Sequence, residues 1–189
     1  MGRPFQGDLS ASVLTEAERQ LDQRPASEIS LREIAQAVGV SHVAIYRHFE
    51  NLDAVFAEIA ANDFRTVEQL LLAAVSEATN EEEALSAAGR AYVAFAVVHP
   101  HRFRSMYRLL GLNHRATKEA ATQLFGVLSE TIRQGQQKGT VILGEPASVA
   151  TAALAAAHGL ACLAIDNAIP PQVANPLGLS EIVASMLRR

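Results

Sequence analysis

Residues 30–49 read SLREIAQAVGVSHVAIYRHF, and this stretch has the pattern of two short helices joined by a tight turn. Ser30 and Glu33 match a capping box, in which each side chain bonds a free backbone N–H at the start of a helix. Gly39 follows the last apolar residue of the first helix, where a left-handed residue ends a helix with least strain. Ser41 can then cap a second helix. This spacing predicts a helix-turn-helix, a unit that lays its second helix in the major groove of DNA.

The apolar residues of this stretch predict which side of each helix faces inward. Ile34 and Val38 share one face of the first helix, and Ile45 and Phe49 share one face of the second. The side chains that remain on the outer face of the second helix are His42, Val43, Tyr46 and Arg47. We therefore expect the second helix to present a polar surface to solvent or to a partner.

The same residues resemble the N-terminal domain of the TetR family of transcriptional repressors. The family pattern runs from an Ile-Ala-x-x-x-Gly-Val-Ser turn into a hydrophobic residue followed by Tyr-x-His-Phe. The positions that carry it here are Ile34, Ala35, Gly39, Val40, Ser41, Ile45, Tyr46, His48 and Phe49. The resemblance implies a three-helix DNA-binding domain over residues 1–48 and a larger helical domain for ligand binding and dimerisation over residues 49–189.

The resemblance also implies which residues contact double-stranded DNA. In the family, outward residues early in the recognition helix read bases, and the Tyr and His near its end mainly contact phosphates. Arg47 is the expected reader of guanine or a strong phosphate anchor, and Arg3 of the N-terminal arm could enter the minor groove. The complete predicted DNA-binding set is Arg3, Arg32, Ser41, His42, Val43, Ala44, Tyr46, Arg47 and His48.

Three features depart from a strong DNA-binding pattern. Val43 and Ala44 stand where the family usually has Gly-Thr or similar, so Val43 offers thymine a methyl surface rather than a hydrogen bond. Leu52 replaces a lysine that commonly contacts phosphate in the family. The net charge is −4, and residues 1–50 contain five arginines against seven acidic residues, so non-specific affinity should be modest. A helical interaction module that has lost DNA binding therefore remains an alternative.

Helical periodicity continues through the rest of the chain and predicts an all-α fold. Nearly half of the 189 residues are apolar, alanine is the commonest of them, and no convincing strand alternation occurs. The expected helices cover about residues 8–23, 31–38, 42–49, 51–76, 81 to Pro100, 101–110, 116–138, 146–168 and 178–188.

The second half resembles the C-terminal domain of a TetR subgroup named for Trp, His and Gly. The matching segments are YVAFA…HPHRFRSMY at 92–107 and HGLA at 158–161, while Leu154 stands where we would expect the tryptophan. Such a domain implies a cavity for a small apolar or amphipathic ligand, with no further cofactor. The side chains expected to line it are Phe95, Phe103, Met106, Tyr107, Phe125, Leu128, His158 and Cys162, although the bulky ones could equally be ordinary core.

Residues 146–165 contain no charged side chain over about the length of a membrane span. Because the run is mostly alanine and contains His158, we interpret it as a helix buried at a subunit interface rather than in a membrane. Helices 116–138 and 146–168, paired with their symmetry mates, would form a four-helix homodimer contact.

His158, Cys162 and Asp166 recur every four residues, a spacing at which His and Cys could bind zinc with further ligands. We favour a hydrogen-bonded packing role for them, with no metal. No nucleophile and base signature stands out, so an enzyme that uses the cavity is the weaker alternative. The single cysteine and the absence of a signal-peptide pattern suit the cytoplasm. The sequence thus predicts a ligand-responsive transcriptional repressor that binds a palindromic operator as a homodimer.

Overall fold

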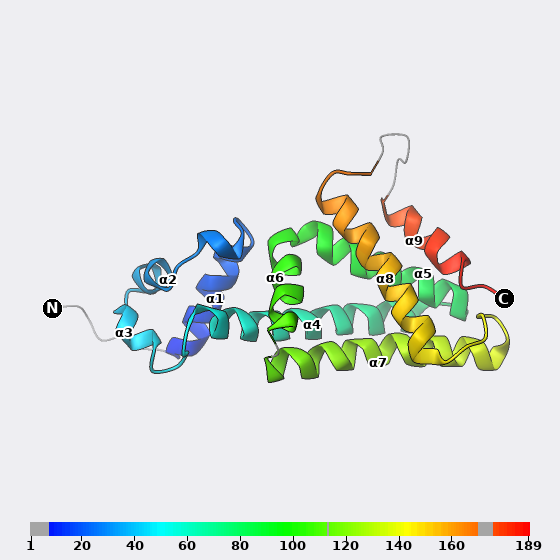
Figure 1. Ribbon diagram of the computed structural model, residues 1–189, viewed down its shortest axis with the longest axis horizontal. Coiled ribbons are helices and arrows are strands. Elements are labelled where there is room, and N and C mark those ends of the chain that lie inside the picture. The colour runs from blue at the N-terminus through cyan, green and yellow to red at the C-terminus, as the bar shows by residue number, and fades with distance from the viewer. Residues whose placement is uncertain (1–7, 113, 170–175) are drawn as a thin grey trace. The chain divides into compact units, whose positions relative to one another are not determined.

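The computed structural model describes residues 8–112, 114–169 and 176–189, and it is built from helices (Figure 1). Across these residues the only β-type pairing is an isolated bridge between Val141 and Arg188, so the predicted all-α fold is confirmed. The helices are α1 (Leu9–Leu21), the 3-10 turn η1 (Ala26–Glu28), α2 (Leu31–Val38), α3 (His42–Ile45), α4 (Leu52–Glu77), α5 (Glu81–Val98), α6 (Pro100–Gly111), α7 (Arg115–Lys138), α8 (Pro146–Ile165) and α9 (Pro176–Ser185).

The helices form two compact units, and each unit is discontinuous in sequence. The head unit contains Met1–Asp63 and His101–Ala120, and the body unit contains Phe64–Pro100 and Ala121–Arg189. Helices α4 and α7 each contribute several residues to both units, and α6 begins at Pro100 in the body unit and continues in the head unit. The sequence analysis divided the chain at residue 48 by expected function, with DNA binding before it and ligand binding and dimerisation after it. The compact units do not test that functional division, which stays a prediction.

The head unit has a core to which α1, α2 and α3 each contribute. Val13 and Leu21 of α1, Ile34 of α2 and Ile45 of α3 have no exposed side-chain surface, and Phe49 is 6% exposed. Val38, which was expected to share the inward face of Ile34, is half-buried. The inward faces that the sequence predicted for the two short helices are therefore confirmed at three of their four positions.

A buried ion cluster connects α6 to α1 and α4 within the head unit. Arg102 of α6 is 9% exposed, and its Nε lies 3.1 and 3.3 Å from the two carboxylate oxygens of Asp63 in α4. Its Nη1 lies 2.7 Å from Glu18 and 3.6 Å from Asp22, both at the end of α1. Burial alone would lower the pKa of Arg102, but the hydrogen bonds with Asp63 and the nearby carboxylates outweigh burial and raise that pKa.

The body unit has its own core, in which α5 packs against α8 and α9. The segment after α7 closes this core through a short pairing with the end of the chain, since the N–H of Ile142 donates to the carbonyl of Leu187 at 2.8 Å. Gly135 of α7 allows this segment to approach closely, because a Cβ at that position would lie 2.3 Å from Cγ2 of Val141. The buried residues of this cluster are Leu85, Ile132, Val141, Val149, Ala150, Ala153, Ala184 and Leu187.

The helix α8 combines an apolar composition with a largely uncovered surface. By length and composition alone it could cross a membrane, and 28% of its most apolar stretch is buried. Glu145 caps its first turn by accepting the N–H of Ser148 at 2.7 Å, and Pro146 occupies the start, where a missing N–H is harmless. Its uncovered face consists of Thr151, Ala152, Ala155, Ala156, Gly159 and Leu163.

Candidate nucleic-acid interface and ligand cavity

Side-chain caps set the start of both helices in the helix-turn-helix. The N–H of Glu33 donates to Oγ of Ser30 at 3.3 Å, and the N–H of Ser30 donates to Oε2 of Glu33 at 3.0 Å, which completes the predicted capping box. The bonds from the Ser30 hydroxyl and backbone lower the pKa of Glu33. Gly39 takes the left-handed conformation, with φ of 78°. Oγ of Ser41 accepts the N–H of Ala44 at 3.3 Å, so the capping box, the left-handed glycine and the second cap are all present as predicted.

The second helix is shorter than the sequence predicted. We expected it to reach residue 49, but α3 ends at Ile45 and the next three residues form a turn. In that turn the N–H of Arg47 donates to Ala44 at 3.3 Å, and the N–H of His48 donates to Ile45 at 2.9 Å. These bonds span three residues rather than four, because the last turn of a helix commonly tightens in this way.

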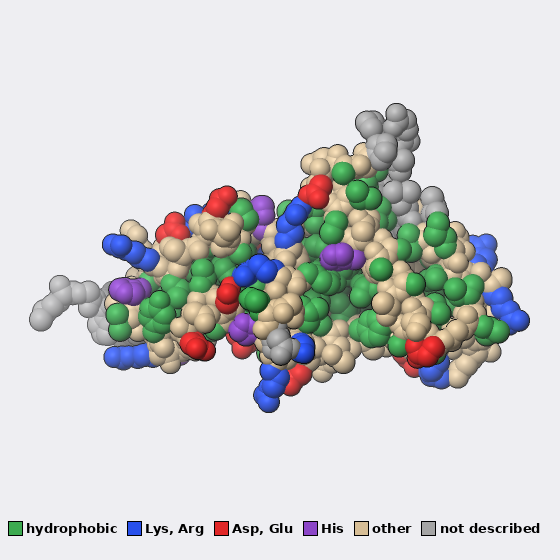
Figure 2. Space-filling view, viewed as in Figure 1, with side chains coloured by type: hydrophobic (Ala, Val, Ile, Leu, Met, Phe, Trp, Pro, Cys, Tyr) green, Lys and Arg blue, Asp and Glu red, His purple; other side chains and the backbone are tan. Residues whose placement is uncertain are grey.

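The outward side of α3 and its final turn forms an exposed surface in the head unit. Val43 is 58% exposed and Tyr46 is 53% exposed, although large apolar groups are usually covered. His42, Arg47 and His48 are also exposed, and the rings of His42 and Tyr46 meet edge-on at 6.3 Å. Figure 2 shows basic, histidine and hydrophobic side chains in the region where Figure 1 draws α2 and α3. This side therefore offers hydrogen-bond donors, cations and a methyl surface together.

The remaining predicted DNA-binding residues occupy different settings. Arg32 is exposed on α2, and within the described part of the chain neither Arg32 nor Arg47 forms an ion pair. Ala44 is half-buried, and Ser41 is exposed and engaged as a cap. Arg3 lies outside the described residues.

The residues expected to line a ligand cavity are divided between the two units. Phe103, Met106 and Tyr107 belong to α6 in the head unit, where Phe103 and Met106 are 1% and 0% exposed. The other five belong to the body unit, and of these Leu128 lines its apolar cavity. Phe103 and Met106 belong to the head core, and Tyr107 is half-buried.

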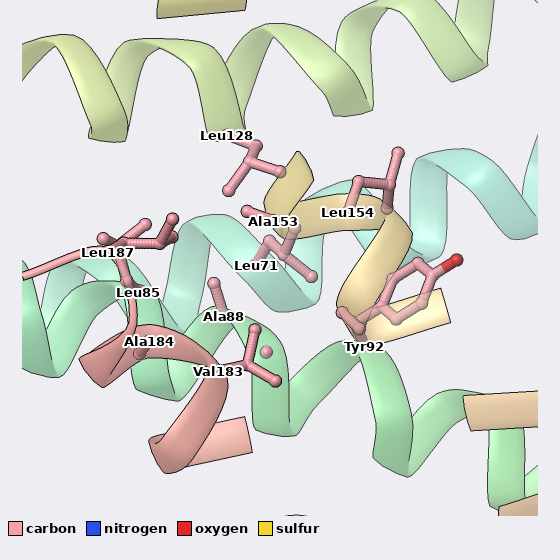
Figure 3. Close-up of a pocket in the computed structure, with 12 residues that line it drawn as sticks. Leu71, Leu85, Ala88, Tyr92, Leu128, Ala153, Leu154, Val183, Ala184 and Leu187 are labelled. Carbon is pink, nitrogen blue, oxygen red and sulfur yellow. The ribbon is translucent and has the colours of Figure 1, made fainter. Parts of the chain in front are cut away.

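Small and aliphatic residues line the cavity that the body unit does contain (Figure 3). They come from α4, α5, α7, α8 and the end of the chain around α9, and they are Leu71, Leu85, Ala88, Gly89, Tyr92, Leu128, Ala153, Leu154, Ala157, Val183, Ala184 and Leu187. Figure 3 shows the side chain of Leu128 directed toward Leu71 and Ala153, while the hydroxyl of Tyr92 points away from them. No single segment of sequence signals this lining, since each helix contributes only a few residues.

A hydrogen-bonded series lies beside this cavity. The hydroxyl of Tyr92 is 3.0 Å from Nδ1 of His158, and Nε2 of His158 is 3.6 Å from Sγ of Cys162. Burial lowers the pKa of His158, which favours the neutral imidazole at pH 7. Among the described residues no group of three His, Cys, Asp or Glu side chains is placed to hold a metal ion.

Comparisons with known proteins agree with this architecture. Residues 13–59 match a family model described as bacterial regulatory proteins of the tetR family, and residues 85–188 match a tetracyclin repressor-like C-terminal domain. A comparison with curated protein sequences gives no match.

Solved structures share the fold over nearly the whole chain. A protein of unknown function from Rhodococcus sp. RHA1 is 26% identical with a TM-score of 0.84, and both chains are covered completely. The TetR family regulator PfmR from Thermus thermophilus is 18% identical with a TM-score of 0.69, covering 92% of this chain and 95% of PfmR. AibR, solved with isovaleryl coenzyme A and operator DNA, is 18% identical with a TM-score of 0.67, covering 94% of this chain and 97% of AibR.

Proposed function

The chain belongs to the TetR family of transcriptional regulators, and from this premise we propose that it is a ligand-responsive repressor that binds a palindromic operator as a homodimer. Membership of a regulator family points to a non-enzymatic role. We further propose that its effector is a small molecule rather than a bound cofactor, and that it acts in the cytoplasm, where the operator lies.

The exposed side of α3 and its final turn is the observation that carries the DNA-binding part of this proposal. Tyr46, Arg47 and His48 project from one short turn, and two of them can donate hydrogen bonds to phosphate while the arginine can bind phosphate or guanine bidentately. Val43 and His42 lie one turn earlier, at the positions that would meet base edges. Arg32, Ser41 and Ala44 would add contacts around them, and Arg3 would add one from the arm.

The uncovered apolar face of α8 supports the homodimer. The helix has no charged side chain from residue 146 to 165, and an exposed apolar surface of this kind marks an interaction site. Alanine and glycine on this face would let a second helix approach closely, and α7 would supply the other half of a four-helix contact. Two-fold symmetry of such a dimer would present two copies of α3 to a palindromic site.

The ligand response would act through α4. This helix lines the body cavity through Leu71 and also contributes residues to the head unit, so a change in its body half can be passed along one continuous element. A ligand shifts the equilibrium only by its differential affinity for the two arrangements. AibR, a relative in fold, was solved with both an acyl-coenzyme A and operator DNA, which supports a combined ligand and DNA response.

Binding of the full chain to duplex DNA tests the proposal. Fragments selected from random oligonucleotides should contain an inverted repeat, and fluorescence anisotropy should show affinity that falls steeply as salt rises. Light scattering should give the mass of a dimer. Arg47→Ala should weaken binding by about 1–3 kcal/mol. Arg19→Ala removes the same charge from a half-exposed site on α1, where Arg19 pairs with Glu16, and should change affinity little.

The same measurements separate the repressor from its alternative. An interaction module that has lost DNA binding would show weak affinity with no preference among oligonucleotides, and Arg47→Ala would behave like Arg19→Ala. A stable monomer in light scattering would also contradict the proposed dimeric repressor.

A further inference from the structure

The body cavity is apolar throughout its described lining. Eleven of its twelve lining residues are glycine, alanine, valine or leucine, and the remaining one is Tyr92, which presents its ring. None of the described lining residues carries a charge. The ionisable group beside Tyr92 is His158, whose Nδ1 lies 3.0 Å from the tyrosine hydroxyl.

This lining discriminates strongly between neutral and charged ligands. A carboxylate or phosphate taken from water into such a cavity would lose its hydration without gaining a cation, which is highly unfavourable. A neutral imidazole at His158 would not supply that cation at pH 7, since burial lowers its pKa. A neutral alcohol, ketone or ester carries a dipole rather than a full charge, so its transfer into this cavity costs far less than that of a carboxylate.

The cavity is also small. It encloses about 40 Å³, whereas a cavity that accepts benzene measures roughly 150 Å³. Its walls include flexible leucines and the end of the chain around Val183 and Leu187, so a few carbon atoms can be accommodated by side-chain rotation. A long acyl chain or a coenzyme A group would require the helices themselves to separate.

We propose that the effector is a small uncharged aliphatic molecule, such as a short branched alcohol, ketone or ester, rather than a carboxylate or an acyl-coenzyme A. This inference rests on the proposed ligand response, because it names the class of molecule that would cause it. It depends on the apolar lining by leucine, alanine, valine and glycine, in which no described residue carries a charge.

Matched probes that share one carbon skeleton test the charge preference directly. Calorimetry of the full-length protein at pH 7 should detect saturable binding of 3-methylbutan-1-ol and of methyl 3-methylbutanoate. Binding of 3-methylbutanoate should be at least tenfold weaker. Equal or tighter binding of the carboxylate would overturn the inference, and so would no binding of either neutral probe.

A cavity-filling variant tests the location. Ala157→Leu places a larger side chain at a half-buried lining position of α8, and it should reduce neutral-probe affinity at least tenfold. Ala73→Leu makes the same change at an exposed position of α4 and should leave the affinity unchanged. If the two variants bind the alcohol equally well, the probe does not occupy this cavity and the inference fails.

Operator binding is measured separately by anisotropy without any probe. Loss of probe binding with intact operator binding would reject the effector class and leave the repressor standing. Probe binding that depends on Ala157, in a protein that binds no operator, would reject the repressor and keep the ligand class.

Discussion

Replacing Arg102 with methionine should destabilise the head unit strongly. Arg102 is 9% exposed, and its main partner, Asp63, is 1% exposed, so both charges lie almost entirely out of water. Methionine preserves much of the side-chain volume but removes every donor from the three carboxylates that the guanidinium now serves. The substitution therefore probes the ion cluster rather than packing.

The loss should come mainly from Asp63. A buried charge that loses its partner typically costs about 3–5 kcal/mol. Glu18 and Asp22 keep 42% and 40% of their side-chain surface exposed, so water can replace the guanidinium there, and each should add at most about 1 kcal/mol. For a chain of this size, a loss of 3–5 kcal/mol corresponds to a fall in Tm of roughly 6–20 °C.

Urea unfolding followed by circular dichroism, at one fixed protein concentration, measures this loss. Arg108→Met is the matched control, because Arg108 also joins α6 to α4 through Asp53 at 2.7 Å, but both members of this pair are nearly half exposed. That control should lose less than about 1 kcal/mol. The double variant Arg102→Met with Asp63→Leu should recover most of the stability, since it leaves no buried charge at Asp63.

Two outcomes would refute this reasoning. If Arg102→Met and Arg108→Met lose similar small amounts, the buried pair is not the source of the predicted effect. If the double variant is as unstable as Arg102→Met alone, the loss arises from disturbed packing rather than from the removal of the guanidinium beside the buried Asp63 carboxylate.

Three further substitutions test single features of the fold. Gly39→Ala should lower the free energy of unfolding in urea by about 1–2 kcal/mol, because alanine must adopt φ of 78°. The control Gly111→Ala lies at a helix end with open space around its Cβ, and it should not lower the stability of the protein. Gly135→Ala should cost about 1–3 kcal/mol by the same assay, since its Cβ would overlap Val141, and a neutral result would mean that the loop moves freely. His158→Gln should flatten the pH dependence of stability below about pH 6.5. Because folding lowers the pKa of His158, the unfolded chain binds the proton at a higher pH than the folded chain does. The stability of the wild type therefore falls as the pH drops below about 6.5. An unchanged pH profile in the glutamine variant would show that His158 contributes nothing to it.

The helix-turn-helix could be predicted from sequence because each of its signals acts over a few residues. The capping box needs only Ser30 and Glu33, and the turn needs a glycine at one position that must be left-handed. Ser41 caps the next helix by accepting the N–H of Ala44, which lies only three residues later in the chain. None of these features depends on how distant parts of the chain pack, so the sequence alone identifies them.

The ligand cavity could not be predicted in the same way. Bulky side chains were the expected lining residues, but large side chains fill the space between helices. Phe103 and Met106, for example, are buried in the core of the head unit. The cavity persists where facing residues are small, as at Ala88 and Ala153, and it needs four helices and the end of the chain to surround it. A vacancy of this kind depends on long-range packing, for which a single sequence offers no periodic signal.

The exposed surface of α3 also depends on what lies inside the head. Four residues are too few to form a stable helix alone, since even good helix formers need about 12–15 residues in water. The position of α3 is therefore fixed by its cap at Ser41 and by burial of Ile45 and Phe49 against the head core. When Ile45 and Phe49 are buried, the geometry of the turn places Tyr46 and Arg47 on the opposite, solvent-facing side. The buried residues Ile45 and Phe49 therefore set the orientation of the candidate DNA-binding side chains. For this reason the apolar pattern of the sequence could predict which residues form the exposed site.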